Sequence, residues 1–397
     1  MSEDERSRGP STVAVHGGEP QVRADRSLTT PVVHASAYPF ENTAELVEYM
    51  EGRRPRPAEY GRYGNPTVEL AEAKLAALEG GEAALLMSSG MATITTTLLA
   101  MLRQGHHVIL TRDVYRKTRV FARQVLARYG VSVDIVEPTA AAVIEAMREQ
   151  TRIVFTEAPT NPYLRVLDLA PVVEQARKRR IKTIIDATFA TPINMKPLEH
   201  GVDLVIHSAT KYLGGHNDLL AGVVVGRAPI VGAIREHLGM TGAVLDPHAA
   251  YLLLRGLKTL ALRVRQQNAT ALRLAHVLAE DPRVQRVWYP LHPQHPDHEV
   301  AKRYLSGGGG VVSFELSGGL AAGTRLVDAV RIPKLAPSLG GVESLIEQPA
   351  LMSFYELSPA EREAIGIVEG LVRLSVGVED VEDLEADLRR ALAGLET

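Results

Sequence analysis

Between about residues 65 and 226, short apolar runs alternate with stretches of helical spacing. The apolar runs show no alternation with polar residues, which is typical of strands buried on both faces. Strands of this kind, separated by helices, form a mostly parallel sheet in an α/β fold. The runs expected as strands are 83–87, 108–110, 131–136, 153–155, 183–185, 204–206 and 223–225.

The pattern changes after about residue 245, where a long helical stretch covers 249–279 and strands then mix with helices. The later expected strands are 284–288, 311–316 and 371–376, and the helices lie near 297–304, 321–329 and 380–394. The segment up to about residue 60 has few periodic elements. We therefore expect an N-terminal arm, a large α/β domain and a smaller C-terminal α+β domain, at 1–60, 61–245 and 246–397.

Composition excludes several classes of protein. Apolar residues make up 45% of the chain and charged residues 23%, which argues against disorder. Lys and Arg total 44 against 47 Asp and Glu, so no excess of positive charge exists to attract nucleic acid or an anionic membrane. The chain has no Cys, which excludes disulfides, thiolate metal sites and a cysteine nucleophile. No long apolar stretch and no secretory signal are found, so we expect a cytoplasmic protein.

The strongest local signal is the segment Ser208–His216, which contains Lys211 and follows the strand 204–206. Open α/β sheets bind ligands at the carboxyl ends of their strands. A lysine there can be buried and form an imine with a carbonyl compound. The alternative is a solvated lysine on a Gly-rich turn.

Other candidate residues also follow expected strands. Asp186 can pair with a protonated pyridine nitrogen, or it can be a turn residue. Ser89, Gly90 and Met91 lie where a strand becomes a helix, and the free N–H groups of a helix start attract phosphate, although an ordinary turn has the same composition. Tyr115 can stack on an aromatic ring, or it can be a core residue.

Two arginines complete this set. Arg62, in the stretch Tyr60–Thr67, can bind phosphate bidentately or lie on a surface loop. Arg373 is a charge inside an apolar strand, which is costly unless a substrate carboxylate or an internal acid pairs with it. Each signal is weak alone. Together they are what pyridoxal phosphate bound to an amino acid requires, which predicts a pyridoxal 5'-phosphate enzyme.

Beyond these single residues, the chain resembles the Cys/Met-metabolism family of pyridoxal-phosphate enzymes from about Leu28 to Leu392. The motifs that carry the resemblance are Tyr60–Thr67, Ser88–Met91, Glu157–Pro162, Asp186–Pro192, Ser208–Tyr212 and Ser338–Gly341. The resemblance implies the aspartate-aminotransferase-like fold (fold type I), with a mostly parallel central sheet and a smaller C-terminal α+β domain. It also implies a homotetramer of two dimers, each sharing its active sites.

The resemblance implies roles for single residues. Lys211 would form the imine and move protons, Asp186 would pair with the pyridine nitrogen, and Tyr115 would stack on the ring. The other implied cofactor contacts are made by Ser89, Gly90, Met91, Asn161, Thr188, Ser208 and Thr210, with Tyr60 and Arg62 contributed by a neighbouring subunit. The implied substrate contacts are made by Arg373, Ser338 and Asn161 at the α-carboxylate, and by Glu343, which with Tyr115 is a candidate to orient or deprotonate the incoming amino acid.

Several stretches are most similar to cystathionine γ-synthases, especially the plant-type form, namely Glu59–Gly64, Tyr115–Thr118, Ser208–Asp218 and Gln348–Ser353. This predicts a γ-replacement that forms L-cystathionine from L-cysteine and a succinyl-, acetyl- or phosphohomoserine. Most γ-lyases have two small residues after the stacking tyrosine, where this chain has Arg116 and Lys117. A cation there would favour an anionic leaving group, unless Lys117 simply starts a solvated helix.

Three alternatives stay open within the enzyme class: a cystathionine γ-lyase, a methionine γ-lyase and a sulfhydrylase that uses sulfide. A nucleotide-binding oxidoreductase or a plain binding protein is a further alternative. It is disfavoured because no G-x-G-x-x-G turn follows the first strand, and the run Gly307–Gly310 is expected as a turn.

The stretch His292–Glu299 is expected as a surface loop without a metal, with Asp297 capping the next helix. The basic stretch Arg53–Arg56 is expected as a solvated loop or a subunit contact.

Overall fold

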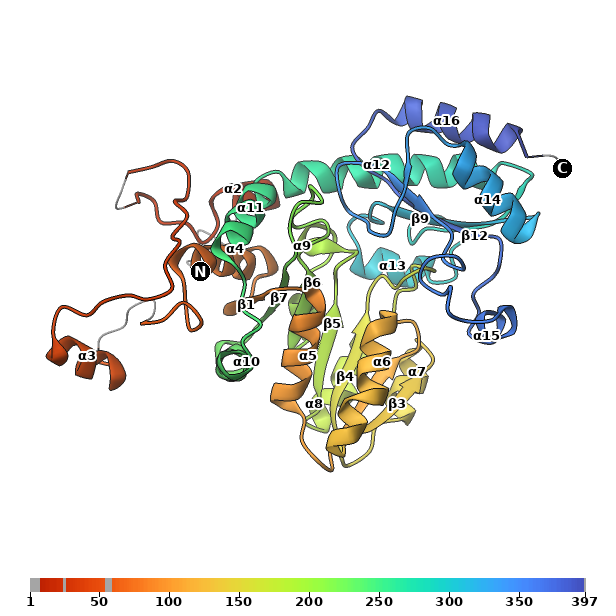
Figure 1. The fold of residues 1–397 in the computed structure, drawn as a ribbon. Coiled ribbons are helices and arrows are strands. Elements are labelled where there is room, and N and C mark those ends of the chain that lie inside the picture. Colours follow the sequence, from red (N-terminus) through yellow and green to blue (C-terminus); the bar gives the residue numbers. More distant parts are fainter. Residues whose placement is uncertain (1–7, 24–25, 54–58, 396–397) are drawn as a thin grey trace.

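The computed structural model describes residues 8–23, 26–53 and 59–395. The described chain contains two sheets, one of seven strands and one of five, with helices on both faces of the larger sheet (Figure 1). The predicted α/β fold with a mostly parallel central sheet is confirmed.

The larger sheet has the order β1-β7-β6-β5-β4-β2-β3. Its strands are β1 (Ala83–Met87), β2 (His107–Thr111), β3 (Ser132–Val136), β4 (Thr151–Glu157), β5 (Lys182–Asp186), β6 (Leu204–Ser208) and β7 (Gly222–Gly226). Five of them, from β3 to β6, run parallel, whereas β7 is antiparallel to both of its neighbours. All seven strands were expected from apolar runs, but the reversed direction of β7 was not.

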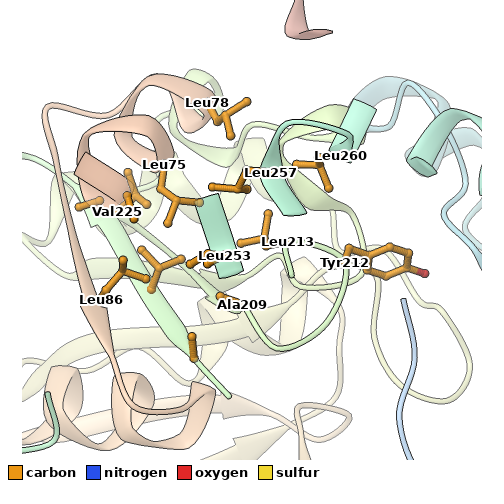
Figure 2. Close-up of a cluster of buried hydrophobic side chains, with 14 of the residues drawn as sticks. Leu75, Leu78, Leu86, Ala209, Tyr212, Leu213, Val225, Leu253, Leu257 and Leu260 are labelled. Atoms are coloured by element: carbon orange, nitrogen blue, oxygen red, sulfur yellow. The ribbon is translucent and has the colours of Figure 1, made fainter. Parts of the chain in front are cut away.

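Helices cover both faces of this sheet because its strands are apolar on both sides. Leu85 and Met87 of β1 pack in one core with α5 (Gly90–Met101), α6 (Arg116–Gln124) and α10 (Ala228–Thr241). Leu86 points the other way and packs against α4 (Pro66–Glu79), as Figure 2 shows. The remaining helices of this part are α7 (Ala140–Glu145), α8 (Leu169–Lys178), α9 (Thr191–Asn194) and the 3₁₀ turns Leu126–Tyr129 and Pro197–His200.

The core drawn in Figure 2 also supports the lysine segment. Tyr212, which follows Lys211, is buried in it, and so is Leu213. Leu253 and Leu257 enter the same core from α11 (Pro247–Leu257), so the first helix after the predicted domain boundary at 245/246 packs on the first half of the chain. The boundary itself stays a prediction.

The smaller sheet has the order β10-β11-β12-β9-β8. Its strands are β8 (Val284–Trp288), β9 (Val311–Leu316), β10 (Lys334–Leu335), β11 (Leu345–Glu347) and β12 (Leu371–Ser375). Its helices are α12 (Leu260–Ala279), α13 (His298–Tyr304), α14 (Gly319–Ala329), α15 (Pro359–Ala364) and α16 (Val381–Ala393). The single helical stretch expected at 249–279 is two helices, because the chain leaves the helix between α11 and α12, where Thr259 occupies the N-cap position of α12.

The N-terminal segment contains α2 (Pro10–His16) and α3 (Thr43–Met50). Figure 1 shows that α3 lies far from both sheets, at the end of an extended stretch of chain. The helix α2 is held on α4 by Lys74, whose buried ammonium donates to the carbonyls of Ala14 and Val15. Of the basic stretch 53–56, Arg53 pairs with Glu51, and residues 54–56 lie outside the described residues.

Two loop predictions have different outcomes. The Gly307–Gly310 run forms a turn between α13 and β9, with Gly309 at φ +86°, as expected. Asp297 does occupy the N-cap position of α13, but its carboxylate makes no capping bond. It accepts instead from Arg165 Nε (2.5 Å) and from the backbone N–H of Val166 (3.0 Å). The predicted capping role is wrong because an ion pair with a distant arginine competes for the same oxygens.

Two further features are absent from the described ranges. Three or more His, Asp or Glu side chains do not come together there in a group that could hold a metal ion. Within the same ranges, no helix is both long enough and apolar enough to cross a membrane.

Candidate active site

A cavity of about 450 Å³ lies at the carboxyl ends of β4, β5 and β6 and reaches the smaller sheet at β11 and β12. It is lined by Ser89, Gly90, Met91, Ile94, Tyr115, Glu157, Asn161, Asp186, Thr188, Phe189, Ser208, Thr210, Lys211, Leu220, Pro337, Ser338, Leu339, Glu347, Ser353 and Arg373. This position agrees with the rule that open α/β sheets bind ligands beyond the carboxyl ends of their strands.

Lys211 enters the cavity from the segment after β6. Its Nζ donates to Ser338 Oγ at 2.8 Å. Burial, with a smaller effect from the positive charge of Arg373, lowers the pKa of Lys211 to about 8. About a tenth of this amine is therefore neutral at pH 7, far more than for an ordinary lysine, and the neutral form is the one that attacks an aldehyde.

Asp186 ends β5 and is 7% exposed. Its Oδ1 accepts from the backbone N–H of Thr188 (3.0 Å) and from Thr188 Oγ1 (2.5 Å). Thr188 Oγ1 in turn accepts from the backbone N–H of Ser208 (2.8 Å), which ties Asp186 to β6. Burial raises the pKa of Asp186. Within the described part of the chain no donor bonds Oδ2, so that oxygen is available to a ligand cation.

Glu157 is a buried carboxyl group in the cavity wall to which the sequence analysis gave no role. It ends β4 directly opposite Asp186 of β5. Burial and the negative charges of Asp186 and Asp113 raise its pKa well above the ordinary value. Its Oε2 accepts from the backbone N–H of Tyr115 at 2.9 Å. The carboxyl therefore fixes the backbone of Tyr115, whose side chain is 46% exposed at the cavity.

The start of α5 forms another wall. Ser89 is its N-cap and accepts from the N–H of Ala92 at 3.0 Å, and Gly90 and Met91 line the cavity beside it. A Cβ on Gly90 would lie 2.9 Å from the Cβ of Ser208, so only glycine fits this approach. Free N–H groups and the helix dipole attract an anion to such a start.

Two hydroxyl groups near the start of α5 differ in their availability. Thr210 Oγ1 both donates to and accepts from the backbone of Ala221, at 3.2 Å and 3.0 Å. The hydroxyl of Ser208 has no partner within the described ranges. Ser208 therefore offers a free donor at this end of the cavity, while Thr210 is already fixed by the chain.

Arg373 lies at the opposite wall, on β12. Its guanidinium donates to Asn161 Oδ1 (3.0 Å) and to the backbone oxygen of Ser338 (3.1 Å). Its Nη2 also lies 2.8 Å from Glu347 Oε1. An internal acid and a ligand carboxylate were the two alternatives for pairing this charge, and the internal acid is present.

Four residues of the predicted site lie outside the cavity lining. Arg62 donates to the carbonyl of Gly239 and stacks over the ring of Tyr63, and Tyr60 is near it in the same loop. Glu343 accepts from Asn217 Nδ2 at 2.7 Å. Lys117, the second residue of α6, is exposed. The cation that does approach the cavity rim is Arg116, which donates to the carbonyl of Ser353 at 3.2 Å.

Two carboxyl groups of the cavity, Glu157 and Glu347, were missed as functional candidates. Glu347 follows Leu345 and Ile346 in a short apolar strand, the same kind of signal that singled out Arg373. The sequence therefore contains two charges in apolar strands, and these two residues, Glu347 and Arg373, are paired across β11 and β12.

The residues present fit pyridoxal phosphate. Lys211 is a buried amine of lowered pKa, and Asp186 offers a free carboxylate oxygen for the pyridine nitrogen. Together with Thr188 we call these the ring end of the cavity. We call Ser89, Gly90, Met91, Ser208 and Thr210 the phosphate end, where the start of α5 offers N–H groups to an anion. The fold and this site define the class of pyridoxal-phosphate-dependent enzymes of fold type I.

Comparison with known proteins gives the family. The Cys/Met metabolism PLP-dependent enzyme family matches residues 11–393, and the chain belongs to that family. The chain is 48% identical over 385 residues to the chloroplastic cystathionine gamma-synthase 1 of Nicotiana tabacum, covering 96% of this chain and 71% of the relative. It is 42% identical over 387 residues to the L-methionine gamma-lyase of Pseudomonas putida, covering 97% of each.

A solved structure agrees with these relatives. The cystathionine gamma synthase of Xanthomonas oryzae pv. oryzae, in complex with aminoacrylate and cysteine, superposes with a TM-score of 0.91 at 36% identity, covering 97% of this chain and 98% of that one. The predicted family, fold type and cofactor are confirmed.

Proposed function

We propose that this protein catalyses a γ-replacement, in which the sulfur of L-cysteine displaces the oxygen substituent of an O-activated homoserine and L-cystathionine is formed. One observation supports the use of an amino acid substrate at this site. Ser338 bonds Lys211 through its hydroxyl and Arg373 through its backbone oxygen, so the reactive amine and the carboxylate anchor are held by one residue. An amino acid fixed by Arg373 is thereby held with its α-carbon close to Lys211.

Pyridoxal phosphate, when bound, accepts the electron pair left behind as protons leave the carbons of an amino acid substrate. The chain supplies the other parts. Lys211 is placed to move the protons of Cα and Cβ, since its lowered pKa allows it both to take and to give a proton near neutral pH. Asp186 is placed to hold a proton on the pyridine nitrogen through its free oxygen.

The bonds at Cγ are where replacement and elimination differ. The oxygen substituent leaves as a carboxylate or a phosphate, and the cysteine thiolate forms the new C–S bond at the same carbon. Tyr115 lines the cavity and is a candidate to orient the incoming amino acid or take its proton. Glu343, the other residue predicted for this role, lies outside the cavity lining. Arg116, rather than Lys117, is the cation at the rim, so we assign to it any attraction for an anionic leaving group.

The second candidate function is a γ-lyase that releases 2-oxobutanoate and ammonia. It is favoured by the 42% identity to a methionine gamma-lyase over nearly the whole chain, which shows that the family uses similar chains for both outcomes. A sulfhydrylase that uses sulfide in place of cysteine is the third.

The predicted homotetramer with shared sites is part of this proposal. Tyr60 and Arg62 lie away from the cavity of their own chain, which supports their assignment to a neighbouring subunit's phosphate end. A cytoplasmic location is also proposed, although one similar relative is chloroplastic.

The reaction is tested with the purified holoenzyme. O-Succinyl-, O-acetyl- and O-phosphohomoserine are each supplied with and without cysteine, and cystathionine and 2-oxobutanoate are quantified by mass spectrometry. We expect cystathionine with at least one donor, at a rate above that of 2-oxobutanoate release from cystathionine or methionine alone. Faster breakdown of the last two would make the protein a γ-lyase, and faster use of sulfide than cysteine would make it a sulfhydrylase.

A further inference from the structure

Glu347 is a buried carboxyl group in the wall of the cavity, 1% exposed, and faces Arg373 across the strand pair β11–β12. Its Oε1 lies 2.8 Å from Arg373 Nη2, yet no donor of the described residues is aligned to make a hydrogen bond to either of its oxygens. A buried carboxylate usually accepts several hydrogen bonds. Glu347 is therefore held by charge attraction rather than by directed bonds.

The Arg373 guanidinium has partners besides Glu347. Two other groups orient it, Asn161 Oδ1 at 3.0 Å and the Ser338 carbonyl at 3.1 Å. What Glu347 adds is a negative charge beside a buried positive charge. Without that charge, no acid would balance the two neighbouring positive charges of Arg373 and Lys211.

We propose that Glu347 is a positioning residue that acts as the resident counter-ion of Arg373 and competes with the substrate α-carboxylate for it. It balances the guanidinium before substrate arrives and after product leaves, and it weakens carboxylate binding so that the product can be released. The inference rests on the proposed role of Arg373 as carboxylate anchor.

This arrangement has a consequence for pH dependence. The charged groups facing Glu347 are Arg373 from β12 and Lys211 from the segment after β6. Burial raises the pKa of Glu347 above the ordinary carboxyl value, against the opposing effect of these two cations. Protonation of Glu347 as the pH falls removes the competing charge. Carboxylate binding to Arg373 therefore becomes tighter at lower pH, as long as the ligand itself stays ionised.

The probe is propionate, which has a carboxylate but no amine, and its inhibition constant is measured against the activated homoserine in the holoenzyme. Glu347→Gln removes the charge and keeps the shape. We expect it to lower the inhibition constant of propionate by about tenfold, because a like charge no longer opposes the ligand. Glu347→Asp keeps the charge and is expected to stay near the wild-type value. Propionamide, which is uncharged, is expected to inhibit both variants and the wild type equally weakly.

The matched control is Glu72→Gln. Glu72 is also buried and pairs with Arg235 at 2.6 Å, but it lies outside the cavity, so the inhibition constant of propionate should not change. Arg373→Ala separates the two proposals. If it raises the inhibition constant while Glu347→Gln leaves it unchanged or raises it, the counter-ion role is wrong and the anchor stands. If Arg373→Ala has no effect, the proposed anchor itself is wrong.

The wild-type protein gives an independent test if Glu347→Gln does not fold. The inhibition constant of propionate is measured from pH 9 downward, over the range in which propionate remains ionised. We expect it to fall with pH toward the pKa of Glu347, and we expect the propionamide value to stay flat. A propionate profile as flat as that of propionamide would overturn the inference.

Discussion

The ring end and the phosphate end of the cavity are built in different ways. Asp186, Thr188 and Lys211 are fixed by bonds to β6 and to Ser338 within one chain. The phosphate end offers N–H groups at the start of α5 and the hydroxyl of Ser208. The cations that line the cavity in the described chain are Lys211, at the ring end, and Arg373, at the opposite wall. A phosphate dianion is bound best with a cation beside it. From this difference we infer that the chemistry depends on one subunit, whereas cofactor retention depends on the proposed contribution of Arg62 from a neighbouring subunit.

Lys211→Ala gives the largest expected effect, because it removes the ring end's reactive amine. We expect the visible absorbance of bound cofactor to be lost and kcat to fall by at least about a thousandfold, since no other group can form the covalent link. Absorbance spectra and product formation measure this. The control is Lys182→Ala on β5, whose ammonium pairs with Asp203 outside the cavity. Retention of both absorbance and turnover in Lys211→Ala would contradict the assignment.

Arg62→Ala tests whether the phosphate end belongs to two subunits. We expect about a ten- to hundredfold loss of cofactor affinity, because a bidentate contact to phosphate disappears. The dissociation constant is measured by titrating the apoenzyme with pyridoxal phosphate.

A mixing experiment sharpens this test. Arg62→Ala and Lys211→Ala subunits are dissociated together, reassembled and assayed at a pyridoxal phosphate concentration too low to load Arg62→Ala alone. A mixed dimer with shared sites contains one site with both groups intact, so activity should return. If Arg62 serves its own chain, every site in the mixture lacks one group and no activity returns.

Gly90→Ala tests the part of the phosphate end that is formed by this chain alone. The added Cβ would lie 2.9 Å from Ser208 Cβ and 3.1 Å from its Oγ, so α5 must shift. We expect cofactor affinity to fall by about tenfold, with a smaller change in kcat at saturating cofactor. Gly232→Ala, on α10 with open space around it, is the matched control and should bind normally. Equal affinity of the two variants would show that α5 does not form the phosphate site.

Glu157→Gln has the smallest expected effect and tests, through stability, the buried carboxyl that lies beside Asp186 of the ring end. A buried carboxyl of raised pKa stabilises the fold at low pH, and that stability is lost as the pH rises toward its folded-state pKa. Between the ordinary and the raised pKa, wild-type stability should fall by about 1.4 kcal/mol per pH unit from this one group. The glutamine variant should lack that slope, while its amide still faces the Tyr115 N–H. Denaturant unfolding at several pH values measures the difference, and parallel profiles would mean that Glu157 is ionised in the fold.

The fold was largely predictable because apolar runs mark buried strands directly. Strand direction was not, since the apolar run of β7 looks the same in either orientation. The break between α11 and α12 was also missed, because the residues on both sides keep helical spacing. The Asp297 cap failed because its partner, Arg165, is more than a hundred residues away along the chain.

The ring end was predictable because Lys211 and Asp186 each follow an apolar strand, and parallel strands bring their carboxyl ends to one edge. The carboxyl groups Glu157 and Glu347 gain their importance from neighbours on adjacent strands, Asp186 and Arg373. Strand pairing is not written in a single sequence, so neither could be assigned a role. The sequence also could not decide whether Arg116 or Lys117 approaches the cavity. Which of two adjacent side chains faces a cavity depends on where the helix begins.

The helix α12 has a further consequence. Leu260 and Val264 at its start pack in the core below the lysine segment, and Leu274 and Leu278 at its end pack under the smaller sheet that carries Arg373. Because α12 is one continuous helix, it fixes the rotation of one sheet relative to the other. Inserting a single residue between its two halves would turn everything beyond by about 100°. A mutation far from any bound molecule could therefore separate the amine from the guanidinium, with every residue that touches the substrate unchanged.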